Sequence, residues 1–410
     1  MPGTANTLVS WAAVAAAAAI SLCLAMACTA RAADRIYWVN GNDLGEDTIG
    51  HANLAGGSGG KITLPGFGIR GLGIDAAAGK LYTLNEPNVP ILSASLDGTG
   101  VAPLNTTGVP PGGEPDRMAV DPGGGKVYWT AVDTDAIFFA NLRGGGGGAL
   151  DTTGVTVREV GAVAVHPAAG RIYWGNGGTI AFASLNGGGG GILDLVNVSS
   201  QSVGGLAIDG SSNRIFWIDP VTETIEFASL GGGMISELDT GAAPINVPQG
   251  LAIDPGASRI YWANAPDDTI GFANLNGGGG GQLDTTGTTP SNPTGPVLLK
   301  TPSPASPPLV KGRSRAGATL SCESSWAADL PESFLYRAPQ TVAYQWLRNG
   351  RPIAGATAQT VKARQAGGYA CQATGTNAAG SASLTSATVS IKAALRLGKV
   401  RLNRATGTAT

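Results

Sequence analysis

Short apolar strands separated by turn residues recur along most of the chain. One strand of each unit carries an aromatic pair, and successive pairs start 45, 46, 45, 43 and 45 residues apart. The pairs are Tyr37-Trp38, Tyr128-Trp129, Tyr173-Trp174, Phe216-Trp217 and Tyr261-Trp262, with Tyr82-Thr83 in the second place. Self-similarity at a fixed period is the mark of a repeat architecture. The spacing therefore predicts six copies of one structural unit.

Each unit contains four short strands in the same order. A Gly-Leu-Ala-Ile-Asp strand precedes the aromatic pair, an Ile-x-x-Ala-x-Leu strand follows it, and a short strand such as Gln282–Thr285 ends the unit. The first strand is rich in Gly and Ala, which suits a crowded central axis. Four short strands with turn residues between them describe one blade of a β-propeller.

The aromatic strand is apolar on both faces. In the first unit Ile36 and Trp38 point to one side, and Tyr37 and Val39 point to the other. A sheet with one solvated face alternates apolar and polar residues, whereas a sheet covered on both faces does not. Neighbouring blades cover each other on both faces, so this pattern favours a propeller.

The first unit lacks a strand ahead of its aromatic pair. A matching segment, Pro293–Leu299, stands 45 residues beyond Pro248–Asp254, after the sixth unit. We expect this segment to complete the first blade and to close the ring, which would leave no open sheet edge. Pro296 lacks an N–H group, so we expect looser pairing there. The predicted propeller covers residues 34–299.

Residues 34–299 resemble the YWTD-type propellers of low-density-lipoprotein-receptor class B repeats. The shared motif is the aromatic pair, preceded by Gly-Leu-Ala-Ile-Asp and followed by Ile-x-x-Ala-x-Leu-x-Gly. The resemblance implies an extracellular, six-bladed domain that binds proteins. The fourth motif position is Asp in the family and matches only at Asp219. It is Ala131 in one unit and Asn in the others, namely Asn40, Asn85, Asn176 and Asn264. The cysteine-rich modules of the receptors are missing, so receptor function does not follow.

The N-terminus has the features of an export signal. An apolar stretch from Trp11 to Ala27 is short for a membrane span and is followed by small residues, which predicts a signal peptide over residues 1–33. No Lys or Arg precedes the apolar stretch. A lipoprotein signal with Cys28 as the lipidated residue and a retained membrane anchor are the alternatives. We expect a secreted or cell-surface protein with no membrane span after signal cleavage.

The C-terminal part resembles a bacterial immunoglobulin-like domain over residues 309–392. Its signature is Cys322, then Trp346, then Tyr369 two residues before Cys371. The resemblance implies an all-β sandwich with Trp346 packed on a Cys322–Cys371 bridge and with Tyr369 as a tyrosine corner. An exported chain in which two cysteines remain after signal cleavage also favours one disulfide. An irregular insertion, Ser324–Pro339, departs from the pattern.

Two segments flank this domain. Residues 300–308 are rich in Pro and predict a stiff linker. Residues 393–410 look like the start of a further β segment that is truncated. The predicted fold class is therefore all-β, a six-bladed propeller followed by an immunoglobulin-like sandwich.

Charge is distributed unevenly along the chain. Only 13% of residues are charged, and residues 34–299 hold 25 acids against 11 bases. Residues 300–410 hold 3 acids against 14 bases. The basic part lacks patches interleaved with aromatic residues, so we expect no nucleic-acid partner.

Catalytic and metal-binding signatures are sparse. His51 and His166 are the only histidines and belong to distant blades, which disfavours a zinc site or a Cys-His nucleophile. The runs Gly144–Gly148, Gly187–Gly191 and Gly277–Gly281 fall between third and fourth strands. No helix follows them, so they predict turns and not nucleotide-binding loops.

Acidic residues gather in the loops between second and third strands, which emerge on the opposite side of the ring from the glycine runs. We hypothesise that this acidic rim binds a cation such as Ca²⁺ or a basic partner surface. The alternative is that these side chains only make local turn hydrogen bonds. The rim comprises Asp43, Glu46, Asp47, Asp133, Asp135, Asp219, Glu223, Asp267 and Asp268.

Two functional classes remain open. The first is an exported, non-catalytic binding or adhesion protein that recognises a protein or another extracellular ligand. The second is a propeller enzyme, of the lyase or lactonase type, with a site in the axial pocket. The axial strands offer Asp75, Asp121, Asp209 and Asp254, which occupy one repeated slot. A repeated slot favours a turn role for these four, so we expect no catalytic residue and favour binding.

Overall fold

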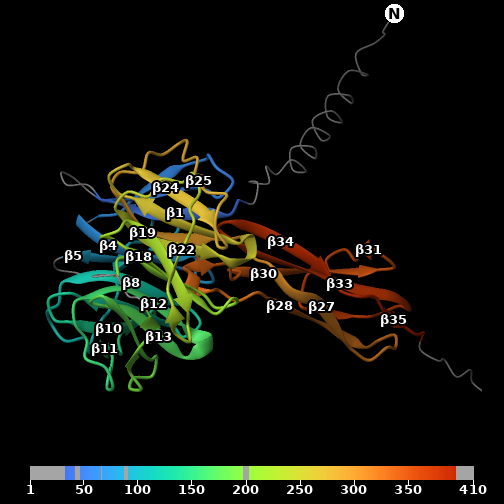
Figure 1. Cartoon of the computed structure of the whole chain (residues 1–410). Coiled ribbons are helices and arrows are strands. Elements are labelled where there is room, and N and C mark those ends of the chain that lie inside the picture. Colours follow the sequence, from blue (N-terminus) through green and yellow to red (C-terminus); the bar gives the residue numbers. More distant parts are fainter. Residues whose placement is uncertain (1–32, 42–46, 66, 87–90, 197–202, 394–410) are drawn as a thin grey trace, which may run out of the picture.

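In the computed structural model, residues 33–41, 47–65, 67–86, 91–196, 203–393 are described. Six antiparallel sheets of four strands stand around one axis and form a six-bladed β-propeller, and a second β module projects from one side (Figure 1). The predicted signal peptide, Cys28, and nearly all of the predicted segment 393–410 lie outside the described residues. Within the described residues, no helix is both long and apolar enough to cross a membrane.

Each blade runs from an innermost strand at the axis to a short strand at the rim. Blades 1 to 3 consist of β26 (Pro293–Leu299), β1 (Arg35–Asn40), β2 (Thr48–Asn53) and β3 (Gly60–Thr63); β4 (Phe67–Asp75), β5 (Lys80–Glu86), β6 (Ile91–Ser95) and β7 (Ala102–Pro103); and β8 (Pro115–Asp121), β9 (Lys126–Ala131), β10 (Ala136–Asn141) and β11 (Gly148–Ala149). Blades 4 to 6 consist of β12 (Val160–His166), β13 (Arg171–Asn176), β14 (Thr179–Ser184) and β15 (Gly191–Ile192); β17 (Leu206–Asp209), β18 (Arg214–Asp219), β19 (Thr224–Ser229) and β21 (Ser236–Glu237); and β22 (Pro248–Asp254), β23 (Arg259–Asn264), β24 (Thr269–Asn274) and β25 (Gly281–Gln282). A small parallel pair, β16 (Leu195–Val196) with β20 (Gly233–Met234), joins blades 4 and 5. The 3₁₀ turns η1 (Pro167–Ala169) and η2 (Pro255–Ala257) follow two of the innermost strands.

The aromatic strands form the core of the ring. In β1 every residue after Arg35 is buried, and β9, β18 and β23 repeat this pattern. The predicted burial on both faces is therefore confirmed. Burying a large apolar side chain contributes about 1.5–3 kcal/mol, so the packing between blades supplies much of the stability of the fold.

The ring closes as the repeat alignment predicts. Strand β26 pairs with β1, with Leu299 opposite Arg35 and Val297 opposite Tyr37. The register shifts between Tyr37 and Val39, beside Pro296. Blades 2, 3, 4 and 6 contain shifts between the same two strands. The irregularity is thus a property of the repeat, and Pro296 is not its cause.

The glycine runs are turns, as predicted, and they also join neighbouring blades. The N–H of Gly188 donates to the carbonyl of Asp151 in the preceding blade (2.7 Å), and that of Gly190 donates to the carbonyl of Thr153 (2.8 Å). Blades 5 and 6 repeat the first of these bonds, and Gly57 closes the circle by donating to Asp284 (2.8 Å). A Cβ atom on Gly190 would stand 2.8 Å from the carbonyl oxygen of Thr152. The turns need glycine because a neighbouring backbone lies against them.

The C-terminal module consists of two sheets. One is built from β27 (Pro304–Gly312), β28 (Thr319–Trp326) and β32 (Thr360–Lys362). The other is built from β31 (Arg351–Pro352), β30 (Thr341–Arg348), β33 (Gly367–Asn377) and β34 (Gly380–Thr385), with β35 (Val389–Ile391) also paired to β33. The predicted Cys322–Cys371 disulfide joins β28 to β33, and Trp346 is fully buried in the same core. The hydroxyl of Tyr369 donates to the carbonyl of Gln365 (3.1 Å).

The prediction of a linker over residues 300–308 is wrong for most of that segment. Strand β27 begins at Pro304 and pairs with β28, so the module starts before residue 309. Lys300 places its ammonium group 2.5 Å from a carboxylate oxygen of Asp254 and 3.6 Å from one of Asp34. Proline lacks the N–H for regular pairing, and β27 accommodates its prolines through two register shifts at its beginning. The connection between propeller and module is therefore short and held by contacts.

The insertion within the module is an ordered element that enters the propeller. We call residues 327–339 the plug; it contains η3 (Pro331–Ser333) and β29 (Leu335–Tyr336). Strand β29 adds to β26 as a parallel neighbour, with Leu335 opposite Leu298. Leu335 and Tyr336 are fully buried and belong to the hydrophobic core of the propeller. The plug is therefore part of the propeller core, while the rest of the module keeps a core of its own around Trp346.

Candidate functional site

The loops on one side of the ring form the upper face, which carries the acidic rim. This face collects the turns between second and third strands and the segments that lead into the innermost strands. Asp43 and Glu46 lie outside the described residues. The exposed members of the rim are Asp133, Asp135, Glu223, Asp267 and Asp268, whereas Asp47 and Asp219 are buried.

Three rim carboxylates connect neighbouring blades. Asp47 accepts a hydrogen bond from the N–H of Ile69 (2.6 Å), Asp135 from that of Val160 (3.4 Å), and Asp268 from that of Asn292 (2.6 Å). In each case the donor lies at the start of the next innermost strand. Charge-assisted hydrogen bonds to backbone N–H groups hold loops in place. These three side chains therefore fix the upper face.

Three further rim residues, Asp133, Asp267 and Asp219, bond within their own blade. Asp133 accepts from the N–H of Glu114 (2.5 Å), and Asp267 accepts from the side-chain amide of Asn246 (2.7 Å). Asp219 accepts from the N–H of Val221 (2.8 Å). Among the described rim residues, Asp219 makes the local turn hydrogen bond that the alternative interpretation expects, whereas Asp133 and Asp267 bond to residues 19 and 21 positions away. Asp133 and Asp267 remain exposed, so their charge also reaches solvent.

The described part of the chain contains no group of three or more His, Cys, Asp or Glu side chains placed to hold a metal ion. The Ca²⁺ hypothesis therefore finds no preformed cage among these residues. The upper face gains two exposed acids that the sequence reasoning missed, Glu114 and Glu159. Both precede an innermost strand, and the repeat itself places such residues on this face.

Arginine side chains lie at the upper mouth of the axial channel. The guanidinium of Arg117 donates to the side-chain oxygen of Gln249 in blade 6 (2.8 Å), on the opposite side of the ring. It also lies 3.3 Å from Asp116 and donates to the carbonyl of Arg70 (3.5 Å). The Arg117–Gln249 bond spans the mouth.

The channel below is narrow and apolar. Its cavity is about 30 Å³, and its walls are mainly Gly, Ala, Leu, Val and Met side chains from the innermost strands. Such a volume holds only one or a few water molecules. A small-molecule site needs about 300 Å³ or more. The axial pocket on which an enzyme would depend is therefore filled.

The plug closes the lower mouth of the channel. The hydroxyl of Ser333 donates to the carbonyl of Ile208 (2.6 Å), and that of Tyr336 donates to the carbonyl of Val120 (3.0 Å). The side chain of Phe334 lines the channel between these contacts. The length and irregularity of Ser324–Pro339 were the only sequence signals for this role, because no repeat position marks its partner.

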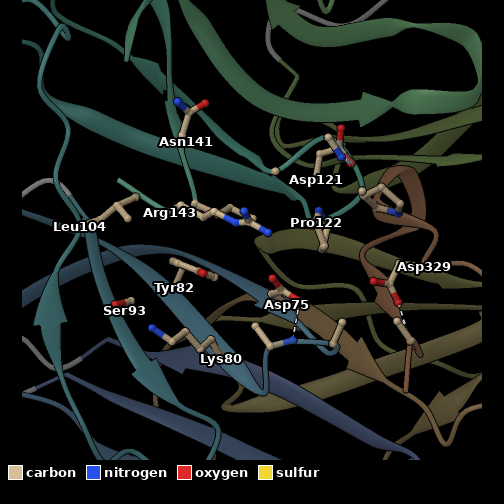
Figure 2. Close-up of a pocket in the computed structure, with 18 of the residues that line it drawn as sticks. Asp75, Lys80, Tyr82, Ser93, Leu104, Asp121, Pro122, Asn141, Arg143 and Asp329 are labelled. Carbon is tan, nitrogen blue, oxygen red and sulfur yellow. Dashed lines mark hydrogen bonds between the residues drawn. The ribbon is translucent and has the colours of Figure 1, made fainter. Parts of the chain in front are cut away.

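A cleft remains beside the plug on the lower face, against blades 2 and 3. It measures about 1590 Å³, and Figure 2 shows Arg143 extending into it, with Asp121 and Asp329 on its border. Asp75, Lys80 and Tyr82 also line it. Burial raises the pKa of Tyr82 to about 12.

Two plug carboxyls border this cleft: Glu332 is buried and Asp329 is half-buried. Burial raises the pKa of Asp329, although the N–H groups of Arg337 and Ala338 donate to it (2.6 and 2.7 Å). Burial raises the pKa of Glu332 to about 7, against the lowering effect of its own backbone N–H and of Arg337. The carboxyls of Asp121 and Asp209 also face Glu332 and raise its pKa further.

The four axial aspartates make the turn hydrogen bonds expected of a repeated slot. Asp75, Asp121 and Asp254 each accept from the N–H three residues later, at 2.9, 2.9 and 3.1 Å. Asp209 accepts from the N–H and the hydroxyl of Ser211. Desolvation by itself would raise the pKa of Asp209, but these bonds and those from Ser212 lower the pKa below its ordinary value. Asp254 additionally binds Lys300. No two of these carboxylates share a hydrogen-bond partner among the described contacts.

Comparisons with known proteins place the fold. No protein-family model matches the chain, and no curated protein matches it. Among solved structures, a chain of the crystal structure of the nidogen/laminin complex matches with a TM-score of 0.53 and 18% sequence identity. The match covers 65% of this chain and 98% of that chain. The propeller is therefore similar in fold to the YWTD propeller of nidogen.

Proposed function

We propose that the chain is an exported, non-catalytic binding protein whose upper propeller face recognises a protein or another extracellular ligand with a basic surface. The observation that carries the proposal is the closure of the axial channel at both ends, by Arg117–Gln249 above and by the plug below. With the channel filled, a ligand must bind on an outer face of the ring, and the plug occupies part of the lower face. Its loops are held by hydrogen bonds between blades, which lowers the entropic cost of binding.

The alternative is a propeller enzyme of the lyase or lactonase type. It has less support, because an axial site would need space that the channel of about 30 Å³ lacks. The cleft beside the plug is large enough and contains Glu332, whose pKa is about 7. A carboxyl with a pKa near neutrality suits a general acid or base. It makes this cleft the place where the enzyme alternative should be tested.

The C-terminal module supports an extracellular setting. We infer that it is immunoglobulin-like, because a disulfide joins its two sheets over a buried Trp346 and Tyr369 bonds back to the carbonyl of Gln365. Disulfides persist in oxidising compartments. The structure similar in fold is that of a nidogen/laminin complex. That precedent suits a protein partner for the present propeller.

A charge-neutralising variant tests the upper face. Asp133, Asp135, Asp267 and Asp268 are changed together to Asn, which keeps the oxygen that accepts each backbone hydrogen bond and removes four charges. The matched control changes Asp97, Asp151, Asp194 and Asp239 to Asn; these exposed aspartates lie in turns beside the third and fourth strands, outside the groove that Asp267 and Asp268 line. The probe is a lysine-rich peptide, titrated against each protein by calorimetry at low and high salt.

We expect the rim variant to bind at least about tenfold more weakly than the control, because each exposed ion pair contributes about 0.2–1 kcal/mol. Equal binding by both variants would contradict the proposal. A parallel titration with Ca²⁺ tests the cation hypothesis. If adding Ca²⁺ produces binding heat with the unaltered protein and none with the rim variant, the rim is a Ca²⁺ site and not a surface for a basic partner.

A further inference from the structure

The end of the C-terminal module farthest from the plug is strongly cationic. A groove of about 1050 Å³ runs along the β30–β31 hairpin and strand β32. Its lining contains Arg348, Arg351, Lys362 and Arg364 and no Asp or Glu. Arg351, Lys362 and Arg364 are exposed, and Arg348 is half-buried. None of the four makes an ion pair or a side-chain hydrogen bond among the described residues.

Further cations stand beside the groove. The N–H of Gly317 donates to the carbonyl of Ala363 (2.7 Å), which brings the turn after β27 next to Arg364. This turn carries the exposed Arg313 and Arg315, and Arg315 forms a β-bridge with Lys392. Seven cationic residues thus gather at one end of the module.

The acids of the module lie elsewhere. Asp329 and Glu332 belong to the plug, and Glu323 pairs with Lys311 at 2.7 Å. Like charges that lack counter-charges repel one another and raise the local positive potential. An anionic ligand would relieve that repulsion, and the groove gives it a surface to follow.

We propose that this groove binds an acidic polysaccharide, a chain of sugars with regularly repeated carboxylate, sulfate or phosphate groups. Exposed Thr360 and Gln365 line the groove and offer partners for sugar hydroxyls. The planar guanidinium of arginine can donate two parallel hydrogen bonds to two oxygens of a carboxylate, sulfate or phosphate group. This site is separate from the upper propeller face, which has the opposite charge.

Other polyanions fit the groove less well. Single-stranded nucleic acids bind through aromatic side chains on which the bases stack, and the only aromatic residue of the groove, Tyr369, is buried. A membrane surface engages basic residues together with exposed large apolar side chains. Ile353, the largest apolar residue of the groove after Tyr369, is half-buried.

The test uses the full mature chain and heparin as the sulfated probe, polygalacturonate as the carboxylated probe and dextran as the uncharged one. Arg351, Lys362 and Arg364 are changed together to Gln. The matched control changes Lys61, Arg143 and Arg158 to Gln, three exposed cations of the propeller, so both variants lose the same charge. Circular dichroism and melting curves check that each variant folds.

We expect the unaltered protein and the control to bind at least one acidic polysaccharide and not dextran, with affinity falling as salt rises. The groove variant should bind at least about tenfold more weakly, since three exposed charge contacts are lost. Equal weakening in both variants would reduce the effect to net charge and overturn the proposal. Stronger binding to single-stranded DNA or to anionic vesicles than to either polysaccharide would overturn it too.

Discussion

Single buried residues in repeated slots hold the loops of the upper face in place. Asn40, Asn176 and Asn264 stand where the similar family has Asp, and each accepts an N–H from the segment that leads into the innermost strand of its own blade. All three are buried. A neutral amide costs less to bury than a carboxylate. Asn in place of the motif's Asp therefore keeps the oxygen that accepts the hydrogen bond and avoids a buried negative charge.

The glycine turns give a prediction at this scale. Replacing Gly190 by Ala places a methyl group 2.8 Å from the carbonyl oxygen of Thr152 and 2.7 Å from Val155. We expect the free energy of unfolding to fall by about 2–3 kcal/mol because the neighbouring blade must move. Gly189→Ala is the control: it has φ +62° but open space around the new atom, so it should cost only about 1 kcal/mol. Equal losses in denaturant titrations would show that the contact between blades is unimportant.

Glu332 predicts a pH dependence of stability. Its pKa rises from 4.5 to about 7 in the folded protein, so the folded state binds more protons than the unfolded chain between these values. Its contribution to stability is fully present below about pH 4.5 and is lost as pH rises towards 7. Asp121 and Asp209 strengthen this trend and Arg337 opposes it. His166, whose pKa is lowered by burial, adds an opposite dependence near and below its ordinary value of 6.5.

A neutral side chain at this position should remove the effect. We expect Glu332→Gln to melt at a higher temperature than the unaltered protein at about pH 8 and to lose that advantage at about pH 4.5. Glu323→Gln, which neutralises an exposed acid of the same module, should not change the difference between the two pH values. A Gln variant that is less stable than the unaltered protein at both pH values would refute the assignment.

At the scale of elements, the plug is the feature that joins the two parts of the chain. Its strand extends blade 1, its hydroxyl groups bind carbonyl groups at the ends of innermost strands, and Phe334 lines the channel. Buried carbonyl groups need such partners. The plug thus satisfies backbone groups of the propeller while adding apolar surface to its core.

Removing one hydroxyl tests this description. Tyr336→Phe keeps the buried ring and leaves the carbonyl of Val120 without its donor, so we expect a loss of about 1–2 kcal/mol in the free energy of unfolding. Tyr344→Phe, which changes a partly buried hydroxyl in the same module, is the control because its contact with Ser324 is weak at 3.5 Å. Indistinguishable losses in the two variants would count against the plug as a stabilising element.

The elements that could be predicted are those that repeat. Six occurrences of one pattern identify the blades, their order and even the ring closure at Val297 and Tyr37. The plug occurs once, and its contacts join residues more than one hundred positions apart, as with Ser333 and Ile208. Proline content suggested a linker where β27 forms, because composition does not reveal pairing partners. The repeat places the rim residues in equivalent loops, whereas the hydrogen bonds that some of them make to the next blade depend on three-dimensional placement.

At the scale of the whole molecule, the propeller and the C-terminal module are joined by direct contacts and carry opposite net charges. The propeller is acidic and the module basic, and the cationic groove lies at the end of the module away from the plug. The plug, the Lys300–Asp254 ion pair and the bond from Asn377 to the carbonyl of Lys300 (2.8 Å) hold the parts together. Such contacts restrict motion between domains. The acidic face and the basic groove are therefore presented at separate places on one connected body.

The coupling predicts how the molecule melts. With the plug in place we expect propeller and module to unfold in one calorimetric transition. Replacing the plug, residues 327–339, by a short Gly-Ser connection removes the module's contribution to the propeller core, so two transitions should appear, with the propeller melting at a lower temperature. The disulfide is kept in both proteins. A single unchanged transition in the replaced protein would mean that the plug does not couple the two parts.

The ring closure has a consequence for how the protein is made. Strand β1 leaves the ribosome more than 250 residues before its partner β26. Until then the first blade has a bare backbone edge that can pair with any other extended chain. A premature stop before residue 293 would make that exposure permanent. Truncated translation products of this protein should therefore aggregate readily and be favoured substrates for the proteases that clear incomplete chains.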